Sequence, residues 1–459
     1  MLLALLVACS APEAPPPPGP TRPDVLVISL DTTRADVIDE VTTPNLVKLR
    51  ARGTWWRWAF SHAPTTAYSH ASVFTGFDGH GHGVPRNGVA LPAGLPTLAE
   101  RFDAAGYATI GVVGASVLST RSGLNRGFRI WNDDMDIARK ARHETTADRV
   151  TVRALEEIRR PKPDMPVFAF VHYWDAHGPY QAPQPYTRRF VDPAYDGPMA
   201  GRRTDIERFA SQVRGGRATP EDAAALRGLY RGEVAWVDAQ IAVLLDGLRA
   251  RGIAGDEDLV AVFADHGEAL GEPGDFPVGH GADVDPYATH VPLILVGPGV
   301  PAGENNRHSV ALSALGPTLL AIAGLDPSLG DAARLPLADA PATSKPAPIF
   351  QEATKPAEMY RREGWPNLDL ERAVVLGEDV LVSTPWKGGR RLPSAPGGPV
   401  LFRRSPGFPE ASAAPRADDA AVARQLGILL AEWHAKAPKG DATEDPDMGD
   451  ALEALGYRE

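Results

Sequence analysis

The sequence predicts an α/β fold with a mostly parallel central β-sheet. Three short and almost continuously apolar runs support this prediction, at residues 24–30, 166–173 and 258–264. Such runs are typical of strands that are covered on both faces, as in parallel sheets. Patterns with a helical period predict helices around the strands, at residues 45–52, 96–105, 142–160, 220–251 and 312–323.

A change in composition divides the chain. Residues 326–348 are rich in Ala, Pro and Leu, which is typical of a domain boundary. We therefore predict a main domain at residues 24–335 and a smaller C-terminal α+β subdomain with its tail at residues 345–459. The polar, Arg-rich residues 183–219 predict an irregular excursion on the surface, with a lid as one interpretation. In the C-terminal part we expect strands near residues 348–350 and 373–376 and a helix at residues 418–436.

The first residues resemble a bacterial lipoprotein signal. Residues 1–9 are apolar and end in Leu-Val-Ala-Cys, and Cys9 is the single cysteine of the chain. This resembles a lipobox, which predicts lipidation of Cys9 and a semi-rigid, Pro-rich tether at residues 10–23. Because Ser10 is not a retention Asp, we expect an anchor in the outer membrane, facing the periplasm. The alternative is a misassigned start codon or a truncated signal.

The overall charge excludes one class of partner. The formal net charge is -11, and no basic block offsets it, which argues against a nucleic-acid partner. A small anionic substrate stays compatible with this charge, because one metal ion and a helix start can dominate the local potential.

A loop that turns into a helix predicts an anion site. Residues 64–76 begin with Pro and two threonines and end with a glycine, so we expect a helix over residues 67–74 with a threonine N-cap. Free N–H groups at a helix start suit phosphate or sulfate. Thr66 would stand at that point, and its hydroxyl is a nucleophile only if a base or a metal takes its proton.

Polar residues follow two of the predicted strands and could supply that metal. Asp31 comes directly after the first apolar run, and Asp265 and His266 follow the run at residues 258–264. Ligands gather at the carboxyl ends of parallel strands. Asp31, Asp265, His266 and the Thr66 hydroxyl therefore predict a site for one divalent ion: Mn, Zn, Mg or Ca.

These segments, taken together and in order, resemble the sulfatase family of the alkaline phosphatase superfamily. The matching blocks are residues 30–36, 43–46, 64–76, 172–180, 265–268, 280–281, 291–294 and 297–299. Each block alone is a weak signal, whereas the ordered set over roughly residues 24–330 is a strong one. The resemblance implies an alkaline-phosphatase-like three-layer α/β/α sandwich.

The resemblance also implies roles for further residues. His177 and His280 match family histidines that contact the transferred group or the leaving oxygen, so both are expected to be catalytic. Ser69 and His70, in the first turn after Thr66, are expected to bind the substrate. A second metal ion would need further ligands, for which Asp175, His177 and His280 are the obvious supply.

One departure from the family pattern concerns the nucleophile. Sulfatases carry Cys or Ser within Cys/Ser-x-Pro-x-Arg and oxidise it to formylglycine, whereas this chain has Thr66, Tyr68 and His70 at the three defined positions. Thr is the metal-bound nucleophile of phosphodiesterases and phosphoethanolamine-type transferases in the same superfamily. Thr32 stands where sulfatases have a second Asp ligand, which makes a Mn or Zn site more plausible than a calcium site.

The sequence therefore predicts a metal-dependent hydrolase or transferase that acts on phosphate or phosphonate esters through Thr66. Two alternatives stay open. One is a sulfuric ester hydrolase that works without formylglycine, and the other is an inactive, lipid-tethered binding protein. The intact set of Asp31, Thr66, Asp265 and His266 argues against the inactive protein.

Overall fold

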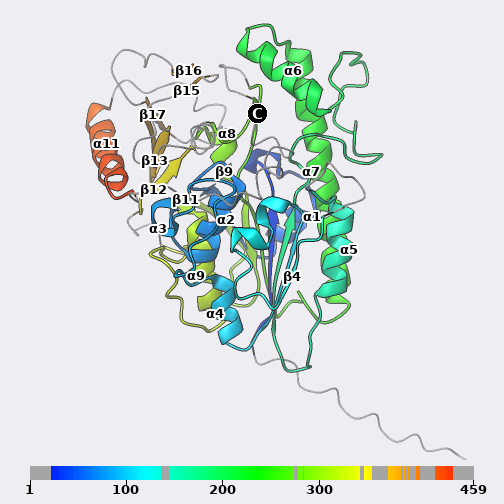
Figure 1. Cartoon of the computed structure of the whole chain (residues 1–459), viewed down its shortest axis with the longest axis vertical. Coiled ribbons are helices and arrows are strands. Elements are labelled where there is room, and N and C mark those ends of the chain that lie inside the picture. Colours follow the sequence, from blue (N-terminus) through cyan, green and yellow to red (C-terminus); the bar gives the residue numbers. More distant parts are fainter. Residues whose placement is uncertain are drawn as a thin grey trace, which may run out of the picture.

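A large mixed sheet forms the centre of the molecule. The computed structural model describes residues 22–135, 144–272, 278–282, 284–341, 346–353, 371–383, 386–387, 390–391, 400–403 and 419–437. The strands of the central sheet are β1 (Val25–Leu30), β2 (Thr54–Phe60), β3 (Ala108–Val113), β4 (Ile130–Asn132), β5 (Val167–Tyr173), β6 (Leu259–Ala264), β9 (His290–Val291), β10 (Leu293–Val296) and β11 (Gly303–Ala311). Their order is β11-β2-β10-β6-β1-β5-β3-β4, with β9 beside β2. The sheet runs through the middle of the molecule, between the helices (Figure 1).

Most neighbouring strands in this sheet are parallel. β1 pairs with β5 and β6 in parallel, and β3 does the same with β4 and β5. β10 is antiparallel to both of its neighbours, β2 and β6, which makes the sheet mixed. The predicted α/β class with a mostly parallel sheet is therefore confirmed.

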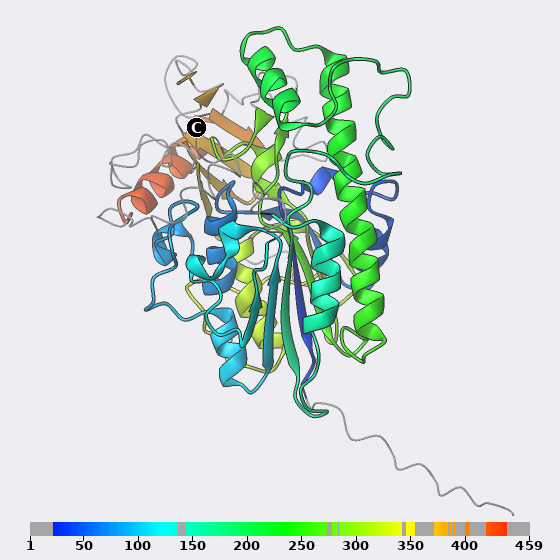
Figure 2. The same ribbon diagram turned by 45° about the vertical axis from the view of Figure 1, so that its right-hand side comes forward.

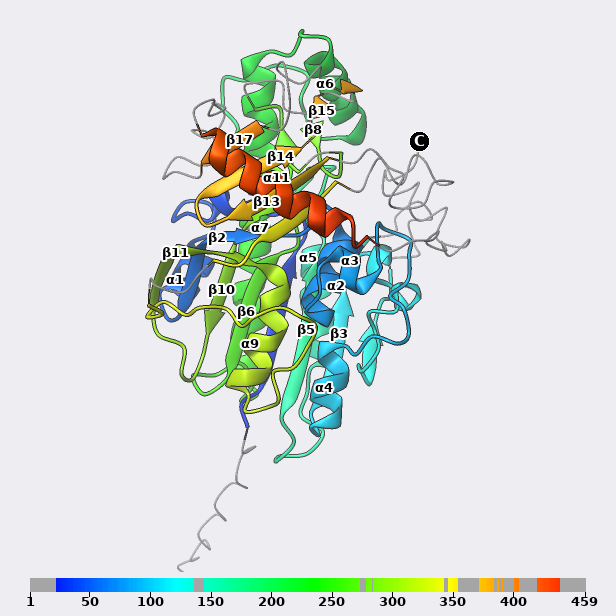
Figure 3. The same cartoon turned by 90° about the vertical axis from the view of Figure 1, so that its left-hand side faces the viewer.

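Helices cover both faces of the sheet. α1 (Pro44–Arg50), α5 (Ala147–Glu157) and α7 (Pro220–Arg249) contact one another on one face. On the other face α2 (Thr66–Thr75), α4 (Leu98–Ala104) and α9 (Leu315–Ile322) form a second layer. The two layers lie on opposite sides of the strands when the molecule is turned (Figures 2 and 3). The fold is therefore the predicted three-layer sandwich.

The apolar residues of the strands explain why the helices pack there. All six residues of β1 and of β6 are buried, as their continuous apolar runs predict. Phe102 of α4 stacks on Phe168 of β5, with ring centroids 4.3 Å apart, and neither ring is exposed. A reciprocal capping box between Thr97 and Glu100 starts α4, which fixes the helix over the sheet.

The segment between β5 and α7 is more ordered than its sequence predicts. Within residues 183–219, which we expected to be irregular, the structure contains α6 (Arg203–Arg214). Phe209 of this helix is buried and shares a hydrophobic cluster with Leu270 of β7 (Ala269–Leu270). The expectation of an irregular segment was wrong because Ile206, Phe209 and Val213 lie on one helical face among many charged residues.

A second, antiparallel sheet follows in the C-terminal part. Its order is β12 (Ile349–Glu352), β13 (Arg372–Leu376), β14 (Asp379–Ser383) and β17 (Val400–Arg403), and α11 (Ala420–His434) packs on it. The described residues also contain the short elements α3 (Gly79–His82), α8 (Pro286–Thr289), β8 (Val278–Gly279), β15 (Trp386–Lys387) and β16 (Arg390–Arg391). The small C-terminal antiparallel sheet agrees with the predicted α+β character of this part.

Several expectations fall on residues that the structure does not describe. The expected signal at residues 1–9 with Cys9, most of the tether at residues 10–23, and the tail after residue 437 lie outside the described residues. Among the helices of the described part, none combines the length and the apolar character that a membrane span requires.

Asp24, at the start of β1, gives the stability of the sheet a dependence on pH. Its side chain accepts a hydrogen bond from the Val167 amide (2.7 Å) and pairs with Arg160. Burial, with a contribution from Asp258, raises the pKa of Asp24 from 3.8 to about 6. The folded state therefore holds this proton more tightly than the unfolded chain does. The resulting stabilisation, about 3 kcal/mol, is present at low pH and is lost as the pH rises through about 6.

An Asp24→Asn variant tests this assignment. We expect the free energy of unfolding of the wild type, relative to the variant, to decrease as the pH rises from about 4 to about 8. Urea titrations of both proteins at several pH values measure the difference, and Asp256→Asn, at a side chain that is 88% exposed, is the matched control. A difference that stays constant or grows with pH would contradict the assignment.

Candidate active site

The ends of β1 and β6 bring two carboxylates together. These strands are parallel and in register, with Leu30 opposite Ala264, so the residues that follow them, Asp31 and Asp265, are neighbours. His266 Nε2 lies 3.6 Å from Asp265 Oδ2 and 3.9 Å from Asp31 Oδ1. All three side chains are fully buried. The predicted acidic site thus exists at the carboxyl edge of the sheet.

The start of α2 lies against these carboxylates. Thr66 is the first residue of the helix, and its Oγ1 is 3.3 Å from Asp31 Oδ2 and 3.5 Å from His266 Nε2. Gly76 ends the helix with a φ of 71°, as its place in the sequence predicts. The structure therefore brings together Thr66 and the three predicted metal ligands.

The helix start is capped differently from the expectation. Thr65 occupies the N-cap position, but its side chain makes no capping hydrogen bond. The Ala67 amide instead donates to Asn87 Oδ1 (2.8 Å), from a loop that follows α3. The side chain that caps the helix thus comes from a distant segment, which a local sequence pattern does not reveal.

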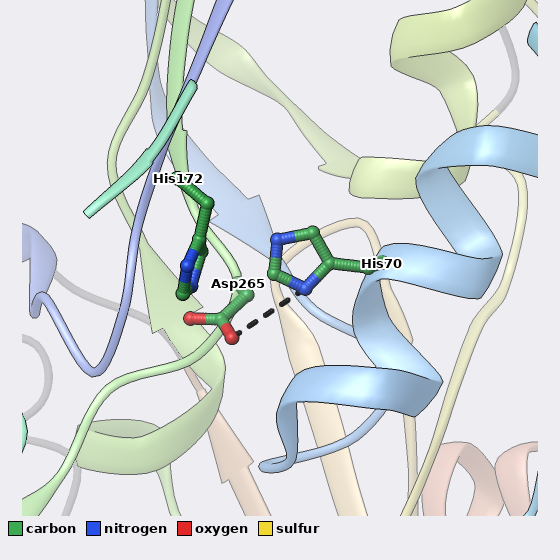
Figure 4. A group of neighbouring side chains, drawn as sticks. All are labelled: His70, His172 and Asp265. Atoms are coloured by element: carbon green, nitrogen blue, oxygen red, sulfur yellow. Dashed lines mark ion pairs between the residues drawn. The ribbon is translucent and has the colours of Figure 1, made fainter. Parts of the chain in front are cut away.

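Two buried histidines flank Asp265. His70 from α2 and His172 from β5 lie on either side of its carboxylate (Figure 4). His70 Nδ1 is 3.7 Å from Asp265 Oδ2, and His172 Nε2 is 3.3 Å from Asp31 Oδ2. The two acidic residues are therefore surrounded by three imidazoles, including that of His266.

The geometry does not support the substrate-binding role that we expected for His70 and Ser69. One ring nitrogen of His70 is hydrogen bonded to the Thr66 carbonyl (2.8 Å) and the other to Ser29 Oγ (2.8 Å). The Ser69 hydroxyl donates to the Asp265 carbonyl (2.7 Å). Both side chains lie on the sheet side of α2, where they fix the helix start to β1 and to the loop after β6.

Burial and charge shift the titration of this cluster in different directions. Burial, with the nearby Asp265, raises the pKa of Asp31 well above its usual value. For Asp265 burial acts in the same sense, but His266, His70 and His172 outweigh it and lower the pKa. Burial lowers the pKa values of His70 and His172 to about 4, so these two imidazoles are neutral. For His266 burial is outweighed by the two carboxylates, which raise its pKa.

The two histidines predicted to be catalytic also lie beside this cluster. The ring centroid of His280 is 4.5 Å from that of His266 and 5.1 Å from that of His177. His177 stacks on Trp174 (4.0 Å), and its Nδ1 is hydrogen bonded to the Gly178 carbonyl (2.8 Å). The structure therefore groups His177 and His280 on the His266 side of the site.

Comparison with known proteins identifies the family. The family described as Sulfatase matches residues 23–325, which is well over half of the chain. The chain belongs to the sulfatase family. This family is part of the alkaline phosphatase superfamily, as the order of the motifs predicts.

Individual members of the sulfatase family and its structural relatives are only distantly similar. Arylsulfatase K from Bos taurus is 23% identical over 380 residues, which cover 71% of this chain and 69% of that protein. The phosphonate monoester hydrolase of Agrobacterium radiobacter has the same fold, with a TM-score of 0.66, 23% identity and coverage of 91% and 96%. A 2-O GAG sulfatase is similarly close in fold, with a TM-score of 0.65, 17% identity and coverage of 93% and 96%.

Members of the sulfatase family typically bind a divalent metal ion, and the residues of this site fit one. Within the described part of the chain, Asp31 Oδ1 and Asp265 Oδ2 are buried and accept no hydrogen bond. Two buried carboxylates in such a position require a cation. His266 Nδ1 is held by the Gly267 carbonyl (2.9 Å), which leaves Nε2 directed at the carboxylates. Asp31, Asp265, His266 and the Thr66 hydroxyl can therefore hold the ion.

Hydrogen bonds to Tyr230 of α7 fix the turn after Asp31. Thr32, at the position that carries a second Asp in sulfatases, adopts a φ of 48°. The Tyr230 hydroxyl donates to the Thr32 carbonyl (2.9 Å) and accepts from the Arg34 amide (2.9 Å). This clamp fixes a backbone conformation that a β-branched residue rarely adopts, and it holds the turn that carries Asp31.

Three residues of this site have no role assigned from the sequence. His172 was predicted to be part of a buried strand, and its place opposite Ser29, two residues before Asp31, follows only from the register of β5 with β1. Glu268 lies in one of the matching blocks but was given no role, and Asn87 was not considered. Glu268 lies two residues after His266, where its carboxylate contacts His280. Neither of these contacts follows from a local pattern.

The His-containing turn at residues 78–83 packs between α2 and the C-terminal part. Asp78 caps α3, and His82 Nε2 is hydrogen bonded to Ser72 of α2 (3.1 Å). His80 stacks on Trp433 of α11, with ring centroids 3.7 Å apart. The turn therefore connects α2 with α11 of the C-terminal part.

Proposed function

We propose that the protein is a metal-dependent hydrolase or transferase that acts on phosphate or phosphonate esters, with Thr66 as the nucleophile. The position of the Thr66 hydroxyl carries this proposal. Its Oγ1 lies at a helix start, 3.3 Å from Asp31 Oδ2 and 3.5 Å from His266 Nε2. A hydroxyl in this position can lose its proton and attack an anionic ester that is bound at the helix start.

The identity of the nucleophile favours phosphorus over sulfur. Sulfatases with formylglycine derive it from Cys or Ser, and the single cysteine of this chain, Cys9, is far from residue 66 in the sequence. The nearest serine in the helix, Ser69, donates its hydroxyl to a backbone carbonyl. The fold is shared by phosphonate monoester hydrolases and sulfatases alike, so the site and not the fold has to decide the reaction.

The first step is an in-line displacement. A divalent ion held by Asp31, Asp265 and His266 would lower the pKa of the Thr66 hydroxyl and stabilise negative charge. The Thr66 hydroxyl gives its proton to the solvent, and its Oγ1 attacks phosphorus. The bond to the leaving oxygen breaks as this oxygen takes a proton from an acid of the site, and phosphorylated or phosphonylated Thr66 forms. Thr66 Oγ1 regains a proton from the solvent when the group is released. The positive end of the α2 dipole and the side-chain amide of Asn87, whose Oδ1 caps this helix start, stabilise the transferred group.

The second step releases the group from Thr66. Water, or an acceptor alcohol in a transferase, attacks phosphorus on the side that the first leaving group vacated. The hydroxyl of Thr66 is thereby restored. Because the group is first bound to Thr66 and then released, the mechanism is covalent catalysis by an activated hydroxyl nucleophile.

Of the two candidate acids, we assign the protonation of the leaving oxygen to His280. Burial, with the nearby His280, lowers the pKa of His177 to about 3, so His177 is neutral at the pH values at which a protein of this kind works. Its Nδ1 is engaged by a backbone carbonyl, which cannot stabilise an imidazolium as a carboxylate does. His280, in contrast, contacts the carboxylate of Glu268.

A panel of esters tests the proposed function. The full chain is freed of metal, reloaded with Mn, Zn, Mg or Ca, and assayed with nitrophenyl phosphate, its diester, a nitrophenyl phosphonate and nitrophenyl sulfate. We expect kcat/KM for the diester or the phosphonate to exceed that for the sulfate by at least about tenfold, which corresponds to about 1.4 kcal/mol. Turnover of the sulfate alone would reject the proposal and favour a sulfuric ester hydrolase.

A further inference from the structure

A carboxylate and a phenol form a chain of hydrogen bonds that ends at His280. Glu268 Oε1 lies 3.1 Å from His280 Nδ1, and the Tyr180 hydroxyl donates to Glu268 Oε2. The side chains of Glu268 and His280 are each 7% exposed, and Tyr180 is buried. A buried carboxylate thus uses both of its oxygens to connect the segment after β5 with the segment after β8.

The backbone at His280 does not by itself fix the direction of this side chain. His280 lies between Gly279, with a φ of 109°, and Gly281, with a φ of 89°. The preceding strand β8 pairs with β7 over only two residue pairs. Glycines with positive φ allow many backbone conformations. The orientation of the imidazole therefore depends on its side-chain contacts, which include the hydrogen bond to Glu268.

The imidazole lies beside the two histidines at the edge of the acidic cluster. Its centroid is 4.5 Å from that of His266 and 5.1 Å from that of His177. Since Nδ1 faces Glu268, the other ring nitrogen, Nε2, is the one that serves the reacting ester. A carboxylate at Nδ1 also favours the tautomer with a proton on that nitrogen.

Glu268 is itself held from two sides. The Arg34 guanidinium donates to the Glu268 carbonyl (3.3 Å) and pairs with Glu272, at the other end of β7. Tyr180 belongs to the hydrophobic cluster that contains Phe209 of α6 and Leu270 of β7. The insertion between β5 and α7 therefore contacts the Glu268 carboxylate, and the turn after Asp31 contacts its backbone.

We propose that Glu268 is a positioning residue that orients His280 as the acid for the leaving group, and that Tyr180 fixes Glu268 for this purpose. The proposal rests on the proposed function. His280 enters this step as the imidazolium, with a proton on each ring nitrogen. When the bond between phosphorus and the leaving oxygen breaks, the proton on Nε2 passes to that oxygen, and the proton on Nδ1 stays hydrogen bonded to Glu268. In the second step Nε2 takes a proton from the attacking water, which restores the starting state.

A series of aryl esters with leaving groups of increasing basicity tests this role. A good leaving group such as dinitrophenolate needs no proton, whereas phenolate does, so a misplaced acid affects the poor leaving groups selectively. We expect Glu268→Gln to lower kcat for the phenyl ester on the order of 10²-fold and to change that for the dinitrophenyl ester less than about threefold. Tyr180→Phe should cause a smaller loss with the same dependence on the leaving group.

Matched variants separate positioning from a purely structural role. Tyr195→Phe removes another phenol of the same insertion, which donates to the carboxylate of Asp222 in α7. This variant should leave the dependence of kcat on the leaving group unchanged. His280→Ala should show the same selectivity as Glu268→Gln, and the double variant should be no slower than His280→Ala alone. Equal losses across the series, or additive losses in the double variant, would overturn the proposal.

The test is independent of which ester is cleaved. If the enzyme turns over sulfates and not phosphonates, the proposed function fails, and the same leaving-group series is run with aryl sulfates. If no ester is cleaved, nitrogen NMR of the zinc-loaded protein decides. At a pH high enough for His280 to be neutral, a proton on Nδ1 in the wild type that moves to Nε2 in Glu268→Gln supports the proposal, and an unchanged tautomer overturns it.

Discussion

Replacing Thr66 by alanine is expected to abolish turnover, with a fall in kcat of at least about 10³-fold on every ester that the wild type cleaves. The hydroxyl would be both the attacking group and a neighbour of the metal ligands Asp31 and His266. No other Ser or Thr hydroxyl of α2 can replace it, because Ser69, Ser72 and Thr75 all donate to backbone carbonyls. Steady-state kinetics with the best ester of the panel measure the loss.

Two further variants make this result specific. Thr66→Ser keeps a hydroxyl at the same position and should retain measurable activity. Thr75→Ala removes a hydroxyl at the other end of the same helix, where Oγ1 donates to the Ala71 carbonyl (2.7 Å), and should leave kcat within about twofold of the wild type. If Thr66→Ala retained wild-type turnover, Thr66 would not be the nucleophile.

Asp31→Asn and Asp265→Asn should each lower metal affinity and turnover by at least about 10²-fold, because each removes one of the two carboxylate ligands. Their effects on the metal-free protein should have opposite signs. Burial and Asp265 raise the pKa of Asp31, so the fold disfavours its charge, and Asn at this position should increase the free energy of unfolding near neutral pH.

For Asp265 the sign is reversed. Burial disfavours its charge, but His266, His70 and His172 outweigh burial and lower its pKa. The folded state therefore gains stability from this carboxylate above its unfolded pKa and loses it as the pH falls through the folded value. Asp265→Asn should consequently decrease the free energy of unfolding.

Urea unfolding in the presence of a chelator and elemental analysis after metal loading measure both effects. Glu304→Asn, at a partly exposed carboxylate that pairs with Arg57, serves as a control for the loss of a charge. A decrease in stability of similar size for both Asp variants would contradict the assignment of charge within the cluster.

The fold and the centre of the site were predictable because they depend on local patterns. Continuous apolar runs identify β1, β5 and β6, and parallel pairing in register then places Asp31 beside Asp265. Thr66 is recognisable as the start of a helix between Pro64 and Gly76. Each of these inferences uses only neighbouring residues and the geometry of parallel sheets.

The remaining features depend on contacts between distant segments. The cap of α2 comes from Asn87, the role of His172 depends on its register with Ser29, and Glu268 reaches His280 across β7 and β8. The hydrogen bonds of His70 to Ser29 and to the Thr66 carbonyl could not be predicted either. Helical spacing predicts the face of α2 on which a side chain lies, but not the residue that it contacts. The apolar face of α6 was missed among the charged residues of its segment.

The mass of the protein during turnover tests the central claim most directly. The full, metal-loaded chain is mixed with the phosphonate ester, quenched with acid within the first turnovers, and analysed as an intact protein and as peptides. We predict one added phosphonyl group on the peptide that contains residues 64–76, located on Thr66 and absent from Thr66→Ala. Rapid turnover in which this group appears on another residue, or a group on this peptide that persists in Thr66→Ala, would contradict the assignment of Thr66 as the nucleophile.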